Sequence, residues 1–261
     1  MANFNVASLM SPSKRPLIAT IVGDGGMGKT TLGSLFPSPV FIRAEDGTQA
    51  IAHREDVAIF PVAKKVADIK EAINSLRTEQ HPFKTLVLDS ITQLDVMIQA
   101  ELIASDPKAK SISTVGGGYG AGWNMVSQTH REIRELCGFL CEEREMNVVF
   151  LAHAQNETVD SPDTDSYLRA TMRLNSKSVG HYSDNVDLVG FLKLKTYVTG
   201  DEKKRAIGDG TRVIACYPTP SHISKNRFGI VADLPFDGVT NPLAAYLGQK
   251  PVDIYDPKGK K

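Results

Sequence analysis

The sequence carries no net charge, no long apolar run and no leader-like start. Its 30 Lys and Arg residues balance 30 Asp and Glu residues. A net charge of zero argues against electrostatic binding of nucleic acid over the whole surface, although it does not exclude a local basic groove. No stretch approaches the roughly 18 consecutive apolar residues of a membrane span, and the opening MANFNVASLMSPSKRP lacks the apolar core of a secretion signal. We therefore expect a soluble, cytoplasmic protein that does not contact a membrane.

Cysteine is scarce, with three residues at positions 137, 141 and 216. An odd number without framework spacing is typical of a reducing compartment. Cys137 and Cys141 lie four residues apart on an expected helix, so they share a face. No further His or Cys cluster completes four metal ligands around them. We interpret both as small buried apolar side chains.

The apolar pattern predicts one large α/β domain. Short β-rich runs at 17–22, 39–43, 57–62, 85–89 and 148–152 alternate with helical patterns at 66–76, 91–102 and 121–145. Such alternation predicts a mainly parallel, twisted sheet with helices on both faces, a three-layer core. Strands near 186–197 and 211–217, joined by a charged Gly-rich turn at 200–210, predict antiparallel strands near the C-terminal end.

The expected domain occupies residues 16–247. An N-terminal arm at 1–15 and a flexible tail at 248–261 flank it. Two segments, about 105–119 and 154–184, are too long for plain connections. Loops of more than about 12–15 residues in a compact domain are usually functional or disordered.

Residues 23–30, GDGGMGKT, match the phosphate-binding pattern G-x-x-x-x-G-K-[ST] between an expected strand and an expected helix. The glycines let consecutive backbone N–H groups point at phosphate oxygens, and the helix that begins at Lys29 adds its positive end. Lys29 is predicted to reach the β- and γ-phosphates of ATP, and the Thr30 hydroxyl to bind Mg²⁺. The predicted nucleotide-binding residues are Gly23, Asp24, Gly25, Gly26, Met27, Gly28, Lys29, Thr30 and Thr31.

Two acidic positions complete the predicted catalytic centre. Asp89 ends the buried run TLVLD, at the sheet edge where parallel sheets bind ligands, and is predicted to hold Mg²⁺. No acid directly follows Asp89, so the general base must come from elsewhere. Glu45, just beyond the strand at 39–43, is the leading candidate, with Asp46 as the alternative. The alternative interpretation is that Glu45 and Asp46 are solvated acids of a loop without a catalytic role.

These motifs resemble the RecA-like ATPase core shared by RecA, RadA, KaiC and DnaB-type helicases. The phrases FIRAE at 41–45, LDS at 88–90 and KNRFG at 225–229 carry the resemblance, which covers about residues 15–235. RecA's C-terminal domain, RadA's zinc finger and protease-like domain, and the helicase collar are missing. The bare core is most similar to the small phage RecA-like single-strand-annealing recombinases, which would place the protein in the host cytoplasm if it is phage-encoded.

The resemblance assigns roles to five further positions. Lys225 and Arg227 would act on the γ-phosphate held by a neighbouring subunit, which implies a homo-oligomer, either a ring or a filament. His153 would sense the γ-phosphate, against the alternative of a solvated strand end. Phe4 and Ala7 resemble a patch by which recombinase protomers bind one another, although Phe4 covering its own sheet edge is the simpler interpretation.

The resemblance also predicts two DNA-contacting loops, at about 105–122 and 154–180. Tyr119 and Trp123 could stack on bases, with a core position as the alternative for Trp123. The second loop also carries several acidic residues, which weighs against DNA contact. The predicted DNA-binding residues are Lys108, Lys110, Tyr119, Arg169, Arg173 and Lys177.

The leading hypothesis is a Mg²⁺-dependent, DNA-stimulated ATP hydrolase that assembles on single-stranded DNA and promotes annealing or homologous recombination. A single-stranded-DNA-binding protein is a further candidate partner. Two alternatives stay open: a ring-forming helicase or translocase core, and a nucleotide-switched binding protein in which hydrolysis is incidental.

Overall fold

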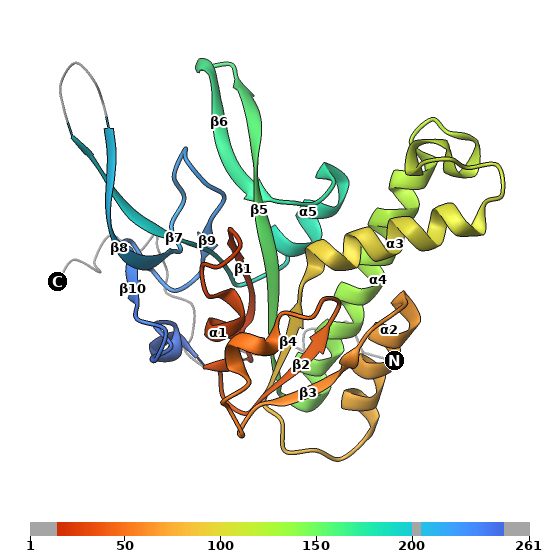
Figure 1. Cartoon of the computed structure of the whole chain (residues 1–261), viewed down its shortest axis with the longest axis horizontal. Coiled ribbons are helices and arrows are strands. Elements are labelled where there is room, and N and C mark those ends of the chain that lie inside the picture. Colours follow the sequence, from red (N-terminus) through yellow and green to blue (C-terminus); the bar gives the residue numbers. More distant parts are fainter. Residues whose placement is uncertain (1–14, 200–204, 248–261) are drawn as a thin grey trace, which may run out of the picture.

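The computed structural model describes residues 15–199 and 205–247, and the predicted arm patch at Phe4 and Ala7 and the predicted tail lie outside them. The chain folds into a mixed sheet with helices on both sides (Figure 1). Its strands are β1 Ile18–Gly23, β2 Pro39–Arg43, β3 Ala58–Val62, β4 Thr85–Asp89, β5 Asn147–Ser161, β6 Thr164–Met172, β7 Leu188–Thr199, β8 Arg205–Ala215, β9 Lys225–Asn226 and β10 Leu234–Phe236. Its helices are α1 Lys29–Ser34, α2 Val66–Thr78, α3 Ile91–Ser105, α4 Ala121–Arg144 and α5 Ser176–Ser183, with short 3-10 turns η2 Thr48–Ile51, η3 Ile112–Gly117 and η4 Ala244–Tyr246.

The strand order is β10-β8-β7-β1-β5-β4-β2-β3, with β6 paired to β5 and β9 paired to β7. The central strands β7, β1, β5, β4, β2 and β3 run parallel. Strand β8 is antiparallel to β7, and β10 is in turn antiparallel to β8. The predicted fold, a mainly parallel sheet with antiparallel strands toward the C-terminal end, is therefore confirmed. Strand β5 separates β1 from β4, so residues at the carboxyl end of its core segment lie between the ends of those two strands.

Strand side chains alternate between two cores, one on each face of the sheet. On β5, Val148 and Phe150 join the core formed with α2, α3, α4 and α5, whereas Val149 and Leu151 join the core formed with α1 and the C-terminal segment. This alternation is the period-2 geometry of a strand buried on both faces. The resulting three layers hold the carboxyl ends of the central strands at one common edge.

The second long segment is more regular than its polar composition predicts. Instead of a connection to about residue 184, β5 continues past the core to Ser161, turns, and returns as β6, followed by α5. The two strands pair antiparallel from Ala154–Met172 to Ser161–Thr164. Their outer parts form a ribbon with many exposed side chains, so the hydrophobic alternation that reveals a half-buried strand is missing. The predicted turn at 200–210 is likewise too long, because β8 begins at Arg205.

The first long segment contains the 3-10 turn η3, which packs on the start of α4. Ile112 and Val115 of this turn are buried. A Cβ atom at Gly122 would lie 2.1 Å from the carbonyl oxygen of Ile112. At that position the Gly-rich run serves a contact within the chain rather than an approach of backbone to DNA. Tyr119, in contrast, is fully exposed.

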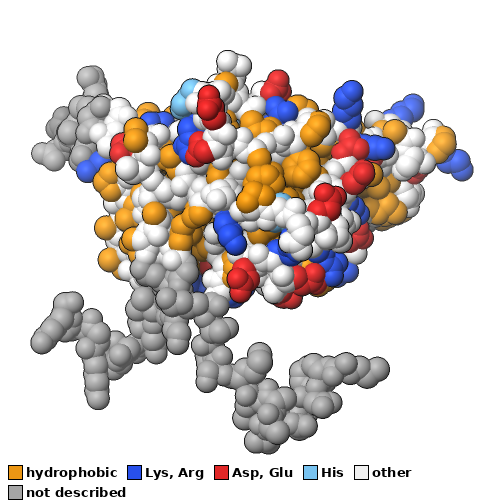
Figure 2. Space-filling view, turned by 90° about the horizontal axis from the view of Figure 1, so that it is seen from below, with side chains coloured by type: hydrophobic (Ala, Val, Ile, Leu, Met, Phe, Trp, Pro, Cys, Tyr) orange, Lys and Arg blue, Asp and Glu red, His pale blue; other side chains and the backbone are white. Residues whose placement is uncertain are grey.

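The three cysteines are buried and free, which agrees with their interpretation as apolar side chains. Burial raises the pKa of Cys137, Cys141 and Cys216 to about 12. Among the described residues, no group of three or more His, Cys, Asp or Glu side chains is arranged to hold a metal ion. Within the same ranges, no helix has the length and apolar character that crossing a membrane requires. Figure 2 shows acidic and basic side chains interspersed with apolar ones on the face that it views.

Candidate active site

The predicted phosphate loop forms the turn between β1 and α1. Gly26 and Gly28 have φ angles of 78° and 97°, a region that glycine adopts without steric cost. This turn carries the Lys29 side chain back over the end of β1, where its ammonium group donates to the carbonyl oxygens of Gly23 and Asp24, each at 2.9 Å. Lys29 is only 7% exposed. Burial lowers the pKa of Lys29, and nearby Asp89 partly opposes that shift.

Thr30 and Asp89 bring two oxygen ligands together. The Thr30 hydroxyl donates to Oδ2 of Asp89 at 2.7 Å, from the first turn of α1 to the end of β4. Asp89 is 4% exposed, and burial raises its pKa, while the bond from Thr30 opposes that effect. A hydroxyl and a carboxylate beside a phosphate loop are the hard oxygen donors that Mg²⁺ uses together with substrate phosphates and water.

Glu45 and His153 stand beside this pair. The backbone N–H of Ala44 donates to the carbonyl oxygen of Asp89 at 2.8 Å, which places Glu45 next to the end of β4. Nε2 of His153 lies 3.3 Å from Oε1 of Glu45, and Nδ1 lies 3.5 Å from Nζ of Lys29. An ammonium group can only donate, so we assign Nδ1 as the acceptor and Nε2 as the donor to Glu45. This bond from His153, and a further one from Ser90, lower the pKa of Glu45.

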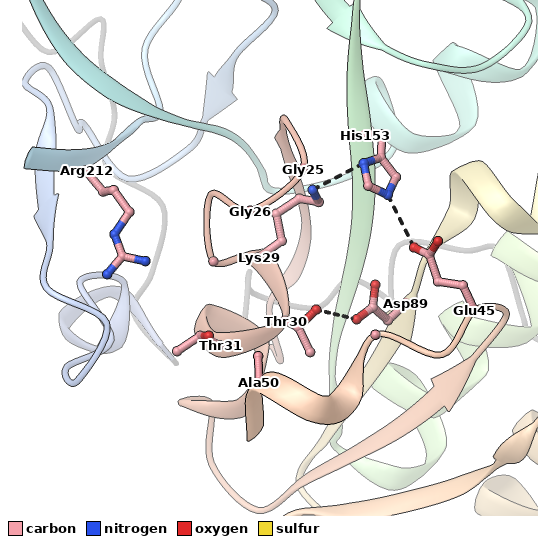
Figure 3. A pocket seen from close by; sticks show the side chains of 12 residues that line it. Gly25, Gly26, Lys29, Thr30, Thr31, Glu45, Ala50, Asp89, His153 and Arg212 are labelled. Carbon is pink, nitrogen blue, oxygen red and sulfur yellow. Dashed lines mark hydrogen bonds and ion pairs between the residues drawn. The ribbon is translucent and has the colours of Figure 1, made fainter. Parts of the chain in front are cut away.

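These side chains line one open cavity of about 380 Å³ (Figure 3). Figure 3 shows His153 and Glu45 on one side of Lys29, and Arg212 on the other. A Cβ atom added to Gly25 or Gly26 would meet nothing within 4 Å, so the loop backbone faces open space. Of the predicted nucleotide-binding residues, Gly23, Asp24 and Met27 do not line the cavity, and the others do. The lining consists of Gly25, Gly26, Gly28, Lys29, Thr30, Thr31, Glu45, Gly47, Ala50, Asp89, His153 and Arg212.

Asp46, the alternative general base, points elsewhere. Nη1 of Arg43 lies 3.1 Å from Oδ1 of Asp46 and donates to Thr48 at 3.0 Å, while Nε of Arg43 donates to the carbonyl oxygen of Phe60. Neither Arg43 nor Asp46 lines the cavity. The geometry therefore favours Glu45 as the residue that accepts a proton from an attacking water.

Lys225 and Arg227 lie outside the cavity, at the opposite edge of the sheet. Strand β9 pairs with Leu188 and Val189, the first residues of β7, whereas the phosphate loop follows the carboxyl end of β1. Nζ of Lys225 donates to the carbonyl oxygen of Asp184 at 2.6 Å, and Arg227 forms an ion pair with Asp187 at 3.1 Å. Neither side chain reaches the phosphate loop of its own chain.

The predicted DNA-binding residues fall into three groups. Lys108 and Lys110 lie on the turn after α3, where both side chains are exposed. Arg169 forms an ion pair with Glu157 across the β5–β6 ribbon, at 2.7 Å. The remaining three lie near the start of α4, and Lys177 among them donates to Asn124 at 2.6 Å: Tyr119, Arg173 and Lys177.

Arg212 is a cavity residue that sequence reasoning missed. It lies on β8, far from the phosphate loop in the chain, and no local motif marks it. Only the pairing of β8 with β7, which itself lies beside β1, brings it there.

Comparison with known families identifies the domain. A family model described as AAA domain matches residues 15–228. The chain belongs to this family. No curated protein matches it. Membership of the AAA domain family, together with the geometry of the phosphate loop, indicates a P-loop nucleotide hydrolase. The finer resemblance to phage recombinases goes beyond this finding.

The residues present fit a nucleoside triphosphate and Mg²⁺. Lys29 offers a buried cation whose hydrogen bonds to the loop run to carbonyl oxygens, and Gly25 and Gly26 offer open backbone. Thr30 and Asp89 would hold Mg²⁺, which when bound supplies neutralising charge at the phosphate oxygens. The chain's own part would then be to orient the phosphates and to accept a proton at the Glu45 carboxylate, whose pKa the hydrogen bond from His153 lowers.

Replacing Glu45 with Gln keeps its size and its hydrogen bond to His153 but removes its basicity. Hydrolysis by Glu45→Gln should fall at least ~100-fold, the usual contribution of general base catalysis, while nucleotide binding persists. Asp46→Asn is the matched control and should hydrolyse near the wild-type rate, because Asp46 faces Arg43. Steady-state phosphate release measures both. The reverse pattern, with Asp46→Asn inactive and Glu45→Gln active, would show that the base assignment is off by one position.

Proposed function

We propose that this AAA-family chain is a Mg²⁺-dependent ATPase that assembles on single-stranded DNA and promotes annealing or homologous recombination, with ATP sites shared between subunits. The observation that supports the DNA-binding part most strongly is a second groove next to the nucleotide cavity. The groove has a volume of about 370 Å³ and lies between α3, the start of α4 and the inner end of β6. Its chemistry and its contacts with the nucleotide site both fit this role.

The groove combines the side-chain types that bind single strands. Trp123 offers an aromatic surface on which a base can stack, and Arg173 offers a guanidinium group to the phosphate backbone. Amide side chains can pair with base edges and carry no charge that would repel the strand, and the one acidic residue of the lining, Asp95, bonds with His130 and Gln99. Four amide side chains line the groove: Gln93, Gln99, Gln155 and Asn175.

The groove touches the strand that bears His153. The Thr92 hydroxyl lines the groove and accepts a hydrogen bond from the backbone N–H of His153 at 3.0 Å. The backbone N–H of Arg173 donates to the carbonyl oxygen of His153 at 2.8 Å. The charge of Arg173 also helps to lower the pKa of Lys29. A nucleotide that displaces His153 would therefore also displace Thr92 and Arg173 of the groove, through these two direct hydrogen bonds.

Further candidate contacts lie around the groove. Nζ of Lys177 is 3.5 Å from the position that a Cβ atom of Gly120 would take, beside the exposed Tyr119. The two predicted DNA-contacting segments thus meet at this point. In Figure 1 the β5–β6 ribbon and strands β7 and β8 extend toward the top of the view, and the end of α3 and the start of α4 lie at its upper right. Lys108 and Lys110 lie on the turn after α3 and would extend a basic track from the groove.

The position of Arg227 supports a shared site. Its side chain is 43% exposed and lies away from the cavity of its own chain, so it is accessible to a neighbour. Arginines supplied from outside a P-loop site can raise the rate about 10³–10⁵-fold. A site completed by the next subunit would couple hydrolysis to assembly on DNA. Lys225 lies on the short strand just before it and would act with Arg227.

Single-stranded DNA should bind more tightly with ATP than without it and should raise the ATPase rate. Each phosphate contact contributes about −0.7 to the slope of log affinity against log salt concentration. A Lys108→Ala/Lys110→Ala variant should flatten that slope by about 0.7 for each DNA phosphate that it no longer neutralises. The matched control is Lys64→Ala/Lys65→Ala, which removes two exposed lysines before α2 and should keep the wild-type slope. Fluorescence anisotropy with labelled oligonucleotides measures both.

Three results would overturn the DNA-binding proposal: no binding in any nucleotide state, equal flattening in both double variants, or an ATPase rate that DNA does not change. An unchanged rate with ATP-dependent protein assembly would favour a nucleotide-switched binding protein. Directional strand displacement would favour the helicase or translocase alternative.

Mixing defective subunits tests the shared site. Lys29→Ala and Arg227→Ala should each be inactive, yet a mixture should recover activity, because some neighbouring pairs then combine an intact phosphate loop with an intact arginine. Arg15→Ala is the matched control: Arg15 also pairs with Asp187, so it removes a partner of the same carboxylate without the proposed role. It should hydrolyse ATP near the wild-type rate. Mixtures that stay inactive although both variants assemble, or an Arg15→Ala loss equal to that of Arg227→Ala, would make Arg227 a structural residue.

A further inference from the structure

A second cation faces the nucleotide cavity from the side opposite the catalytic acids. Arg212 of β8 lines the cavity together with Thr31 and Ala50. Figure 3 shows Arg212 and Thr31 on one side of Lys29, and Glu45 and His153 on the other. The two sides belong to one cavity, so a ligand that fills it meets both.

Contacts with Met27, Phe236 and Asp237 hold the guanidinium group of Arg212 in position. It lies over the ring of Phe236, with Cζ 5.0 Å from the ring centroid. Nη1 donates to the carbonyl oxygen of Met27 and Nη2 to that of Asp237, each at 3.4 Å. A Cβ atom at Gly28 would lie 2.7 Å from Nη1, and one at Gly238 would lie 2.8 Å from Nη2. Both glycines have positive φ angles, so the chain leaves room for this group from two separate segments.

No carboxylate neutralises this charge within the described ranges, since Arg212 forms hydrogen bonds there with backbone carbonyl oxygens and no ion pair. An acidic residue in its surroundings, Asp237, directs its carboxylate to the N–H groups of Val239 and Thr240 and to the Thr240 hydroxyl. A guanidinium group has five N–H donors, and the two long carbonyl bonds leave others available. The site thus offers a planar cation to an anion in the cavity.

The catalytic residues fix which part of a nucleotide Arg212 would meet. Glu45, Thr30 and Asp89 must surround the terminal phosphate, because the base and the metal act there. A triphosphate that runs along the loop from that end places its inner phosphate and ribose toward Thr31 and Arg212. We propose that Arg212 binds, within its own chain, the α-phosphate end of a nucleoside di- or triphosphate and sets nucleotide affinity rather than the rate of hydrolysis. This inference rests on the nucleotide-hydrolase part of the proposed function and not on DNA binding or assembly.

The test compares ADP with ATP on the wild-type protein and two variants, in Mg²⁺-containing buffer without DNA. Arg212→Ala should weaken the binding of both nucleotides roughly 10- to 100-fold, the range expected when a charge-assisted hydrogen bond is removed. The two effects should be equal, because both ligands carry the same α-phosphate. Arg212→Lys, which keeps the charge without the planar fork, should weaken binding less. Isothermal titration calorimetry gives each Kd, and phosphate release at saturating ATP should stay near the wild-type kcat.

Arg131→Ala is the matched control, because Arg131 pairs with Glu135 on the outer face of α4 and should leave both Kd values unchanged. Unchanged Kd values for Arg212→Ala, or a weakening confined to ATP with a fall in kcat, would overturn the proposal. If Arg212→Ala does not fold, two other variants decide. The proposal is overturned if Arg212→Lys and Phe236→Leu both bind ADP and ATP with the wild-type Kd. An absent response to DNA contradicts only the proposed DNA role, whereas a wild-type protein that binds neither nucleotide contradicts the hydrolase assignment and this inference together.

Discussion

A buried ammonium group is the constraint on which the rest of the site depends. Lys29 is held at the end of β1 by two carbonyl oxygens, and in the described residues it forms no ion pair with a carboxylate. Burial disfavours its charge and lowers its pKa. A phosphate anion in the cavity would offset that cost, so the burial of Lys29 favours phosphate binding. Glycines at the turn and the buried β1 strand serve to hold this one group in place.

Strand order brings the predicted catalytic residues to this binding site. Because β5 lies between β1 and β4, His153 at the end of its core segment reaches both Lys29 and Glu45. The same histidine contacts Thr92 through its backbone, so the nucleotide cavity and the second groove share one strand. A single displacement of β5 relative to α3 would alter both sites. The coupling that the proposed stimulation by DNA requires would therefore have a physical route through packed, hydrogen-bonded backbone.

The predictions from the sequence were confirmed where the signal lies in residues that are contiguous in the chain. The strands at 39–43 and 85–89 have the predicted bounds, and α1 begins at Lys29 as expected, because apolar runs and the phosphate-loop motif are contiguous in the chain. Sequence reasoning ranked Glu45 above Asp46 but could not exclude Asp46, since the register of β2 against β4 decides which carboxylate faces the cavity. It missed the β5–β6 ribbon because that ribbon buries little apolar surface. It missed Arg212 because only the pairing of distant strands brings that residue to the loop.

The central claim is that Lys29 makes this chain a phosphate-binding hydrolase. The most direct test is Mg²⁺-dependent phosphate release from ATP by the wild-type protein and by Lys29→Ala, with circular dichroism and thermal unfolding measured on both. The account predicts hydrolysis by the wild-type protein that needs Mg²⁺, and nearly none by a Lys29→Ala protein that keeps the same secondary structure and cooperative unfolding. Wild-type turnover in a folded Lys29→Ala protein would contradict the account.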